Sequence, residues 1–374
     1  MNSSSIPISP RPIIAEFSGK ALIHNVQRAR ALAPSGGKVF AVIKADAYGH
    51  GLAEVAKRIG QAVDGFAILE LSAAQWLRAQ GFKQPIVMLE GFFSPDELAL
   101  FGQLGLSTVV HRADQIDALA NTELAEPIDV FLKMNTGMNR LGIPLEDVKA
   151  VYHRLTTLKS VRNVTLMTHF ADADNARGTD WQLQRLTEAW PDVFALPLCF
   201  ANSAALLVGA NDRTRLGDAV RPGIMLYGAS PWGAQEASKT AEALDLLPVM
   251  TLKSSVIAVQ HLAAGERVGY GGTFVADRPM RIGVVACGYA DGYPRHASNV
   301  APILVDGQRS RVLGRVSMDM LCCDLSDVPD AGVGSPVTLW GAGLPADEVA
   351  DAAGTIAYEL FCALAARVPR VWKD

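Results

Sequence analysis

The sequence contains little that would direct the chain to a membrane or to nucleic acid. Charged residues make up 19% of its 374 positions, the formal net charge is −4, and no block of like charge stands out. Neither a nucleic acid nor a membrane surface is therefore indicated as a partner. No uninterrupted apolar stretch is long enough to span a bilayer, and residues 1–12 lack the apolar core of a signal peptide. We expect a cytoplasmic protein.

Cysteine and histidine are also sparse, and their spacing predicts neither disulfides nor zinc. The five cysteines are Cys199, Cys287, Cys322, Cys323 and Cys362. Their odd number and the absence of metal-knuckle spacing favour reduced, mostly buried thiols. The seven histidines form no HExxH-type pattern. Neither a structural nor a catalytic zinc site is therefore expected.

Length and patterning predict two domains, the first of which is a barrel. A chain of 374 residues exceeds one ordinary core. Short apolar runs alternate with amphipathic segments over residues 38–228. The eight runs are Val39–Ile43, Gly65–Leu69, Pro85–Leu89, Thr108–His111, Asp129–Met134, Val164–His169, Leu198–Ala201 and Ala219–Gly223. Eight such units favour an α/β fold, a (β/α)₈ TIM-type barrel over residues 10–235. An open doubly wound sheet is the alternative, although it would normally need fewer strands.

Local signals indicate where helices of this region begin. Leu52, Val55, Ala56 and Ile59 repeat at helical spacing. Three tetrapeptides, Ser72–Gln75, Ser94–Glu97 and Thr179–Gln182, are typical of capping boxes, in which the first and last side chains satisfy the helix N-terminus.

The pattern changes after residue 235, and residues 236–374 are predicted to form a mainly β domain. The strand-like runs are Met250–Gln260, Arg281–Ala286, Ile303–Val305, Arg311–Val316 and Val337–Leu339. Asp306-Gly307 is a hairpin signal between two of them. Residues 346–354 and 355–366 are expected to be helical.

The most informative stretch runs from Val39 to Gly51. Its five apolar residues fit a strand buried on both faces, and Lys44 follows directly. Desolvation at the end of such a strand disfavours the ammonium form of lysine and leaves more of the nucleophilic amine. The alternative for a lysine taken alone is an amine that extends into solvent.

Other chemically useful residues follow the other predicted strands. Barrel enzymes carry their chemistry at the carboxyl ends of the strands, often with a phosphate site after strands seven and eight. The residues at those ends are Lys133, Arg140, His169, Asn202, Ser203, Arg221, Gly223 and Ile224. The Ser203 hydroxyl and the N–H groups of Gly223 and Ile224 can bind a phosphate. A buried lysine opposite a phosphate cradle is what a pyridoxal phosphate site requires.

These segments together resemble the alanine racemases, which are fold-type III pyridoxal phosphate enzymes. The resemblance covers VIKADAYGHG (42–51), KMNTGMNRLG (133–142), THFA (168–171), NSA (202–204), RPGIMLYG (221–228), VGYG (268–271), GYADGYPR (288–295), GRVSMD (314–319) and YE (358–359). The blocks occur in family order over nearly the whole chain. The segment NTGMNRLG is especially similar to the corresponding segment of catabolic alanine racemases.

The resemblance implies a role for each matching residue. Lys44 would bind pyridoxal phosphate covalently and act as one base, and Tyr270 would be the base on the opposite face. Arg221 would face the pyridine nitrogen with His169 beside the ring, and Arg140, Tyr289 and Met318 would bound the substrate site. The implied phosphate and cofactor ligands are Tyr48, Asn202, Ser203, Gly223, Ile224 and Tyr358. Lys133 matches a lysine often carbamylated in the family. Tyr270 would reach the active site of a partner subunit, so a homodimer is implied.

The expected reaction is interconversion of L- and D-alanine, which would supply peptidoglycan or serve catabolism. A racemase of broader specificity, a fold-type III decarboxylase and a non-catalytic, barrel-only protein that binds pyridoxal phosphate are the alternatives. The motifs around Tyr270 and Arg221 favour racemisation over decarboxylation. The large β domain disfavours the barrel-only alternative.

Overall fold

The computed structural model describes residues 11–209 and 211–374, and their contacts divide the chain into two compact units. One unit is Ile23–Leu226; the other joins the N-terminal residues through Leu22 to Tyr227–Asp374. The division therefore differs from the predicted one at residues 235 and 236. The reason lies in strand β1 (Ile14–Ser18), which pairs antiparallel with β11 (Met250–Leu262) and parallel with β19 (Arg370–Lys373).

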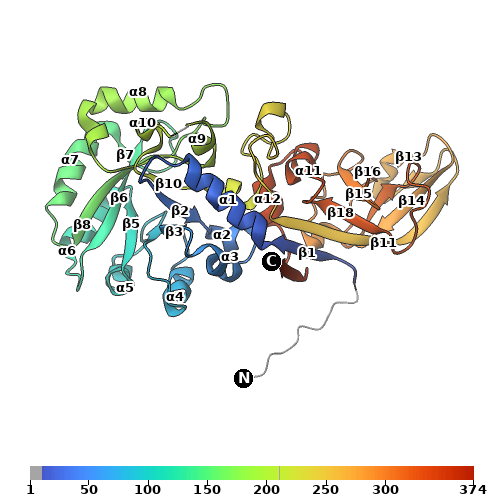
Figure 1. The fold of residues 1–374 in the computed structure, drawn as a ribbon, viewed down its shortest axis with the longest axis horizontal. Coiled ribbons are helices and arrows are strands. Elements are labelled where there is room, and N and C mark those ends of the chain that lie inside the picture. Colours follow the sequence, from blue (N-terminus) through green and yellow to red (C-terminus); the bar gives the residue numbers. More distant parts are fainter. Residues whose placement is uncertain (1–10, 210) are drawn as a thin grey trace, which may run out of the picture. The chain divides into compact units, whose positions relative to one another are not determined.

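The first unit is a closed barrel of eight parallel strands (Figure 1). The strands are β2 (Lys38–Val42), β3 (Gly65–Ile68), β4 (Ile86–Met88), β5 (Leu106–Val110), β6 (Ile128–Asn135), β8 (Val161–Met167), β9 (Leu198–Cys199) and β10 (Ala219–Val220). Each predicted run overlaps one of them. Pairing of β10 with β2 and of β5 with β6 completes the ring. The predicted barrel is thus confirmed, and the open-sheet alternative is wrong. The short β7 (Ile143–Pro144) extends β6 outside the ring.

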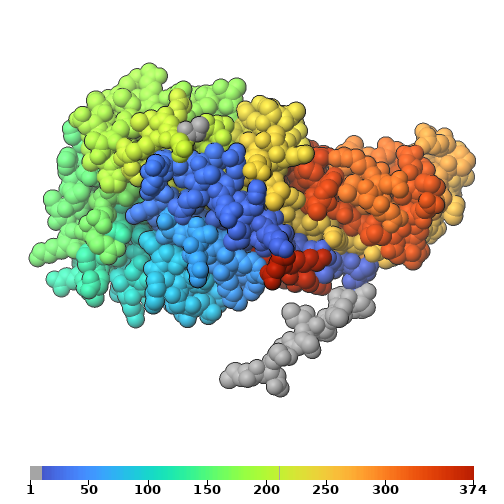
Figure 2. Space-filling model, in the orientation of Figure 1, coloured from blue at the N-terminus to red at the C-terminus, as the bar shows by residue number. Residues whose placement is uncertain are grey.

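Helices follow the strands and cover the barrel. They are α1 (Gly19–Leu32), α2 (Lys44–Tyr48), α3 (Leu52–Ile59), α4 (Leu71–Ala79), α5 (Leu98–Leu104), α6 (Ala113–Asn121), α7 (Leu145–Thr156), α8 (Asp180–Ala189), α9 (Ser203–Val208) and α10 (Arg213–Leu216). In Figure 2, atoms coloured blue to yellow-green make up the visible face of this unit. The strands are hydrophobic along their length because side chains pack against them on both faces.

Two of the three predicted capping boxes are wrong, and the third is correct only in part. Helix α4 begins one residue before Ser72, with Glu70 in the capping position. Ser94 does cap the 3₁₀ turn Pro95–Glu97 by accepting from the Asp96 N–H. Thr179 precedes α8 without a side-chain capping bond. Gln182 is fully buried and bonds elsewhere, so its amide does not return to the helix N-terminus.

The second unit is mainly β, as predicted. Its strands are β1, β11, β12 (Arg267–Val268), β13 (Phe274–Val275), β14 (Met280–Val285), β15 (Pro302–Val305), β16 (Gln308–Leu313), β17 (Leu321–Asp324), β18 (Pro336–Trp340) and β19. The long β11 pairs with β18 through its first half and with β14 through its second, so the sheet closes on itself. The predicted hairpin joins β15 to β16, with Asp306 and Gly307 both at positive φ.

Helices α11 (Ala346–Ala352) and α12 (Ala357–Cys362) lie in the two segments predicted to be helical. Within the described ranges, none of the helices has the length and apolar character needed to cross a membrane.

Candidate active site

Lys44 stands at the carboxyl end of β2 and begins an unusual turn. The next four residues, Ala45–Tyr48, are all left-handed, with φ of 52° to 53°. Left-handed geometry costs an L-residue roughly 1–2 kcal/mol, so this turn is strained. Its backbone bonds include Gly49 N–H to the Ala45 carbonyl at 3.0 Å, and the His50 ring Nδ1 lies 2.8 Å from the Tyr48 carbonyl oxygen. Lys44 itself is half-buried.

The turn directs Tyr48 towards the residues that follow β9 and β10. A Cβ atom at Gly223 would lie 2.5 Å from the Tyr48 hydroxyl, so this glycine lets the tyrosine approach the backbone closely. The Ser203 hydroxyl accepts from the Gly223 N–H at 2.9 Å and from the Met225 N–H at 3.4 Å. Hydroxyl and backbone N–H groups thus converge in a cradle that suits a phosphate.

The lysine and the cradle lie on neighbouring strands and not on opposite sides of the barrel. Strand β2 pairs directly with β10, and the Val42 N–H donates to the Pro222 carbonyl at 3.0 Å. The predicted opposite placement is therefore wrong, because the order of strands around the ring brings the first and the last together. Ser203 follows β9, which pairs with β10, so Lys44, Gly223 and Ser203 come from three consecutive strands of the ring.

Positive charge gathers at the carboxyl ends of the barrel strands. Burial, together with the nearby charges of Arg221, Arg140 and Lys44, lowers the pKa of Lys133 to about 8. Burial and the same cations hold the pKa of His169 well below its usual value. Among the described residues, no three His, Cys, Asp or Glu side chains group so as to hold a metal ion. The site is thus suited to an anionic ligand.

Arg221 is the most firmly held of these cations. Its Nη1 donates to the Cys199 carbonyl at 2.6 Å and its Nη2 to the Thr168 carbonyl at 2.7 Å. Further bonds reach the Cys199 sulfur and the Phe200 carbonyl. These four bonds use both terminal nitrogens and leave the Nε–H as the donor for a ligand atom. Among the described residues, no carboxylate accepts from this buried guanidinium, so its positive charge is not paired with an acidic side chain there.

Arg140 lies in the loop after β6, whose shape depends on an asparagine. The Asn135 side-chain oxygen accepts from the N–H groups of Gly137 and Asn139, at 3.2 and 3.1 Å. Asn139 adopts a positive φ of 56°, which asparagine tolerates better than most residues. The Arg140 side chain itself is exposed. Asn202 caps α9 by accepting from the Ala205 N–H, and Ile224 begins the turn after Gly223.

The remaining predicted site residues belong to the second unit. Tyr270 follows β12 in a turn of three residues and is 72% exposed. Tyr289 and Met318 are adjacent, since the Tyr289 N–H donates to the Ser317 carbonyl and the Ala290 N–H to the Met318 carbonyl. Tyr358 lies in α12 and is half-buried. The structure thus brings Tyr289 and Met318 together and leaves the aromatic ring of Tyr270 open to contact.

Some residues that support the site carried no recognisable signal. His50 belongs to the motif of residues 42–51, which predicts no separate role for it, yet it is fully buried next to the strained turn. Thr168 provides the carbonyl that holds Arg221, which backbone atoms of any residue could do. Its position directly before His169 was the available clue.

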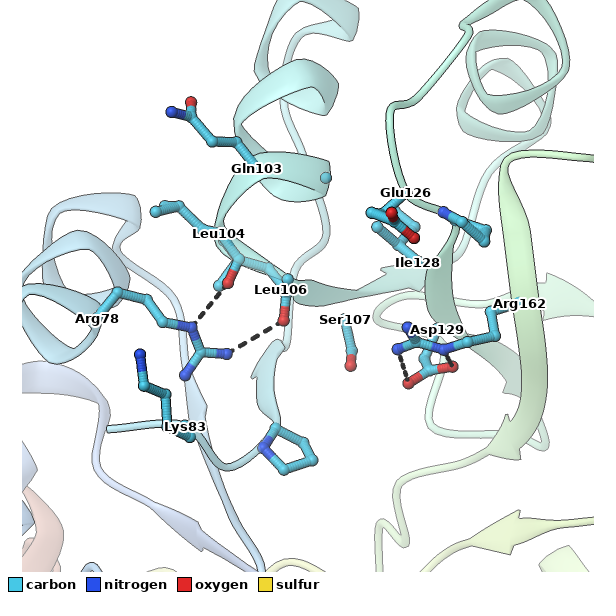
Figure 3. Close-up of a pocket in the computed structure, with 14 residues that line it drawn as sticks. Arg78, Lys83, Gln103, Leu104, Leu106, Ser107, Glu126, Ile128, Asp129 and Arg162 are labelled. Carbon is cyan, nitrogen blue, oxygen red and sulfur yellow. Dashed lines mark hydrogen bonds and ion pairs between the residues drawn. The ribbon is translucent and has the colours of Figure 1, made fainter. Parts of the chain in front are cut away.

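A separate hollow of about 570 Å³ lies at the other end of the barrel, beside the first residues of β4, β5 and β6 (Figure 3). Its polar groups largely satisfy one another. Arg78 donates to four carbonyls, those of Leu104, Phe82, Gln84 and Gly105, and Arg162 pairs with Asp129. Catalytic groups of such barrels lie at the opposite end, so the candidate site is the cationic one.

Comparison with known proteins decides the family. The model of the alanine racemase N-terminal domain matches residues 18–231, and that of the alanine racemase C-terminal domain matches residues 249–372. An alanine racemase of Acidovorax sp. (strain JS42) is 51% identical over 98% of this chain and 100% of its own length. The chain belongs to the alanine racemase family. The resemblance inferred from its motifs is confirmed, and with it the expectation of an isomerase.

Solved structures agree with this assignment to the alanine racemases. The biosynthetic alanine racemase of Pseudomonas aeruginosa superposes with a TM-score of 0.91 at 44% identity, covering 97% of this chain and 100% of the other. An alanine racemase of Bartonella henselae, solved with covalently bound pyridoxal phosphate, gives a TM-score of 0.84 at 26% identity over 97% and 100% of the two chains. The two-part architecture is therefore that of alanine racemases.

Proposed function

We propose that this protein is a pyridoxal phosphate-dependent alanine racemase that interconverts L- and D-alanine with two bases, Lys44 and Tyr270. The observation that carries the proposal is the cationic mouth of the barrel, where Lys44 neighbours a cradle made by Ser203 and Gly223. The bound pyridoxal phosphate of the Bartonella henselae relative supports this choice of cofactor. Tyr48, Ile224 and Tyr358 would complete the phosphate site, and His169 and Asn202 would border the ring.

The cofactor supplies a conjugated, electron-withdrawing ring that acidifies the hydrogen on the α-carbon of a bound amino acid. Lys44 would then remove or return that proton on one face, and the Tyr270 hydroxyl on the other. Two bases are needed because a single fixed base tends to return the proton to the face from which it came. The exposure of Tyr270, at 72%, leaves its hydroxyl free of burial within its own chain.

Arg221 would donate its Nε–H to the pyridine nitrogen without giving up a proton. A guanidinium remains charged at any physiological pH, so it hydrogen-bonds a ring nitrogen and leaves it unprotonated. A less electron-demanding ring favours rapid return of the proton over side reactions. The four bonds that fix the terminal nitrogens of Arg221 support this orientation.

Arg140 would bind the substrate carboxylate, and a carbamylated Lys133 would hold Arg140 in place. The lowered pKa of Lys133, about 8, supports carbamylation because the neutral amine is the form that reacts with carbon dioxide. From the ammonium form, the reaction replaces a cation with an anion and releases two protons, one when the amine becomes neutral and one when the carbamate forms. It would relieve the repulsion among Lys133, Arg140 and Arg221.

The second unit would complete the active site of a partner subunit in a cytoplasmic homodimer. Tyr270, Tyr289 and Met318 are 72%, 41% and 54% exposed, which is unusual for large apolar side chains and typical of an interface. Tyr289 and Met318 would limit the substrate to a small side chain. The D-alanine formed would serve peptidoglycan synthesis or be consumed in catabolism; D-alanine auxotrophy of a deletion strain would indicate the former.

The deciding experiment incubates the holoenzyme with single enantiomers in D₂O. We expect L- and D-alanine to racemise with incorporation of deuterium at the α-carbon. Rates for lysine or arginine that match those for alanine would replace this proposal with a racemase of broader specificity. Borohydride should fix the cofactor on the peptide containing Lys44, and Lys44→Ala should abolish that labelling; labelling of another lysine would contradict the assignment.

A further inference from the structure

A buried glutamine bonds to three residues that lie next to, or belong to, the proposed site. Gln182 lies in α8, and its side chain is fully buried. Its Oε1 accepts from the Ala171 N–H at 2.7 Å, and its Nε2 donates to the Thr136 hydroxyl at 2.6 Å and to the His169 carbonyl at 3.2 Å. All hydrogen-bonding atoms of its amide are therefore used inside the barrel unit.

The bonds beyond Gln182 form a chain with one fixed direction. The Thr168 hydroxyl donates to the Met134 carbonyl at 3.2 Å, an atom that can only accept. In the 2.7 Å bond between the hydroxyls of Thr136 and Thr168, Thr136 must then be the donor. The Thr136 oxygen in turn accepts from Gln182. The donor at the start of the chain is thus the Gln182 amide.

This chain ends on the elements that carry the cations. Thr136 begins the loop that bears Arg140. Thr168 precedes His169, and its carbonyl accepts from Arg221 at 2.7 Å. Loss of the amide would leave the Thr136 oxygen and the His169 carbonyl without this donor, and an unsatisfied polar group away from water is destabilising. The segment 168–171 would then move to recover partners.

We propose that Gln182 is a positioning residue, which orients Arg221 and the Arg140 loop toward the cofactor and the substrate carboxylate by fixing Thr136 and the backbone at residues 168–171. This role rests on the proposed function. Gln182 touches neither the cofactor cradle nor Lys44, so its effect passes through the residues that it holds.

Gln182→Glu keeps the shape of the side chain and removes both donor hydrogens, whereas Gln182→Met removes all its polar atoms. Gln184→Glu is the matched control, because Gln184 is an exposed residue of the same helix whose side chain donates to the Glu188 carboxylate. Thr136→Val interrupts the chain at its second member. The measurements are kcat and KM per bound cofactor, the dissociation constant of pyridoxal phosphate from the apoenzyme, the absorbance spectrum of the holoenzyme, and the melting temperature.

We expect Gln182→Glu, Gln182→Met and Thr136→Val to lower kcat/KM about 10- to 100-fold and to weaken cofactor binding, with the control unchanged. Gln182→Glu should regain activity towards acid pH, where its protonated carboxyl again carries a donor hydrogen, and Gln182→Met should not. Wild-type kinetics and cofactor affinity in the folded variants would overturn the role of Gln182 alone. A wild-type protein that binds no pyridoxal phosphate would overturn the proposed function, and this role with it.

Discussion

Replacing Lys133 with methionine should stabilise the cofactor-free protein at neutral pH. Lys133 is only 9% exposed, and burial with three nearby cations lowers its pKa from 10.5 to about 8. Protonation therefore costs more in the folded chain than in the unfolded one. A difference of about 2.5 pKa units corresponds to roughly 3 kcal/mol, all of it present below pH 8. The penalty declines as the pH rises from 8 to 10.5, because only the folded chain has then lost the proton.

The assay is urea unfolding of wild type and Lys133→Met at pH 7 and pH 10, in buffers free of carbon dioxide. We expect the variant to be more stable than wild type at pH 7, by up to about 3 kcal/mol, and most of that advantage to disappear at pH 10. Lys149→Met, at an exposed position of α7, controls for the loss of a surface charge. A difference between Lys133→Met and wild type that does not change with pH would refute the reasoning.

Three further predictions concern other parts of the chain. Tyr270→Phe should keep the absorbance of bound cofactor and lose racemisation; unchanged turnover would contradict the two-base proposal. Ala45→Gly should leave the free energy of unfolding in urea unchanged or raise it, because glycine adopts the left-handed conformation without strain. Ala73→Gly, inside α4, should lower it by about 1 kcal/mol. Equal losses of stability in the two variants would count against strain at Ala45. Asp347→Asn should stabilise at pH 8 by about 2–4 kcal/mol, since burial raises the pKa of Asp347 from 3.8 to about 7. The gain should vanish near pH 3, below the pKa of the unfolded chain; a gain of equal size at pH 3 would refute it.

The barrel strands could be predicted because they are buried on both faces. Each is a continuous apolar run with a turn signal after it, so local sequence alone marks them. Strand β1 gave no comparable signal, since its five residues alternate between buried and half-buried and its partners lie more than two hundred positions away. The unit to which it belongs is determined by long-range pairing. That pairing is why residues before Leu22 join the second unit.

Within the site, residue types were predictable and their arrangement was not. The motifs identified Lys44 and Gly223 as site residues. That their strands, β2 and β10, are neighbours follows only from the closure of the barrel. The spacing of Gln182 matched a capping box. Its buried amide instead forms hydrogen bonds with Ala171, Thr136 and His169. The spacing of a motif reports local chain geometry, whereas tertiary contacts decide which partner a polar side chain takes.

The left-handed turn after Lys44 shows what the sequence conceals. At roughly 1–2 kcal/mol for each of four residues, the turn costs about 4–8 kcal/mol, a large part of the usual net stability of a protein. A right-handed turn would avoid this cost but would direct residues 45–48 along a different path from β2. The left-handed path keeps Lys44 at the strand end while the Tyr48 hydroxyl meets Gly223. Hydrogen bonds from Gly49 and Gly51, together with the buried His50, hold it there. The strain next to Lys44 thus accompanies the placement of the Tyr48 hydroxyl beside Gly223, and strained backbone of this kind is typical of functional sites.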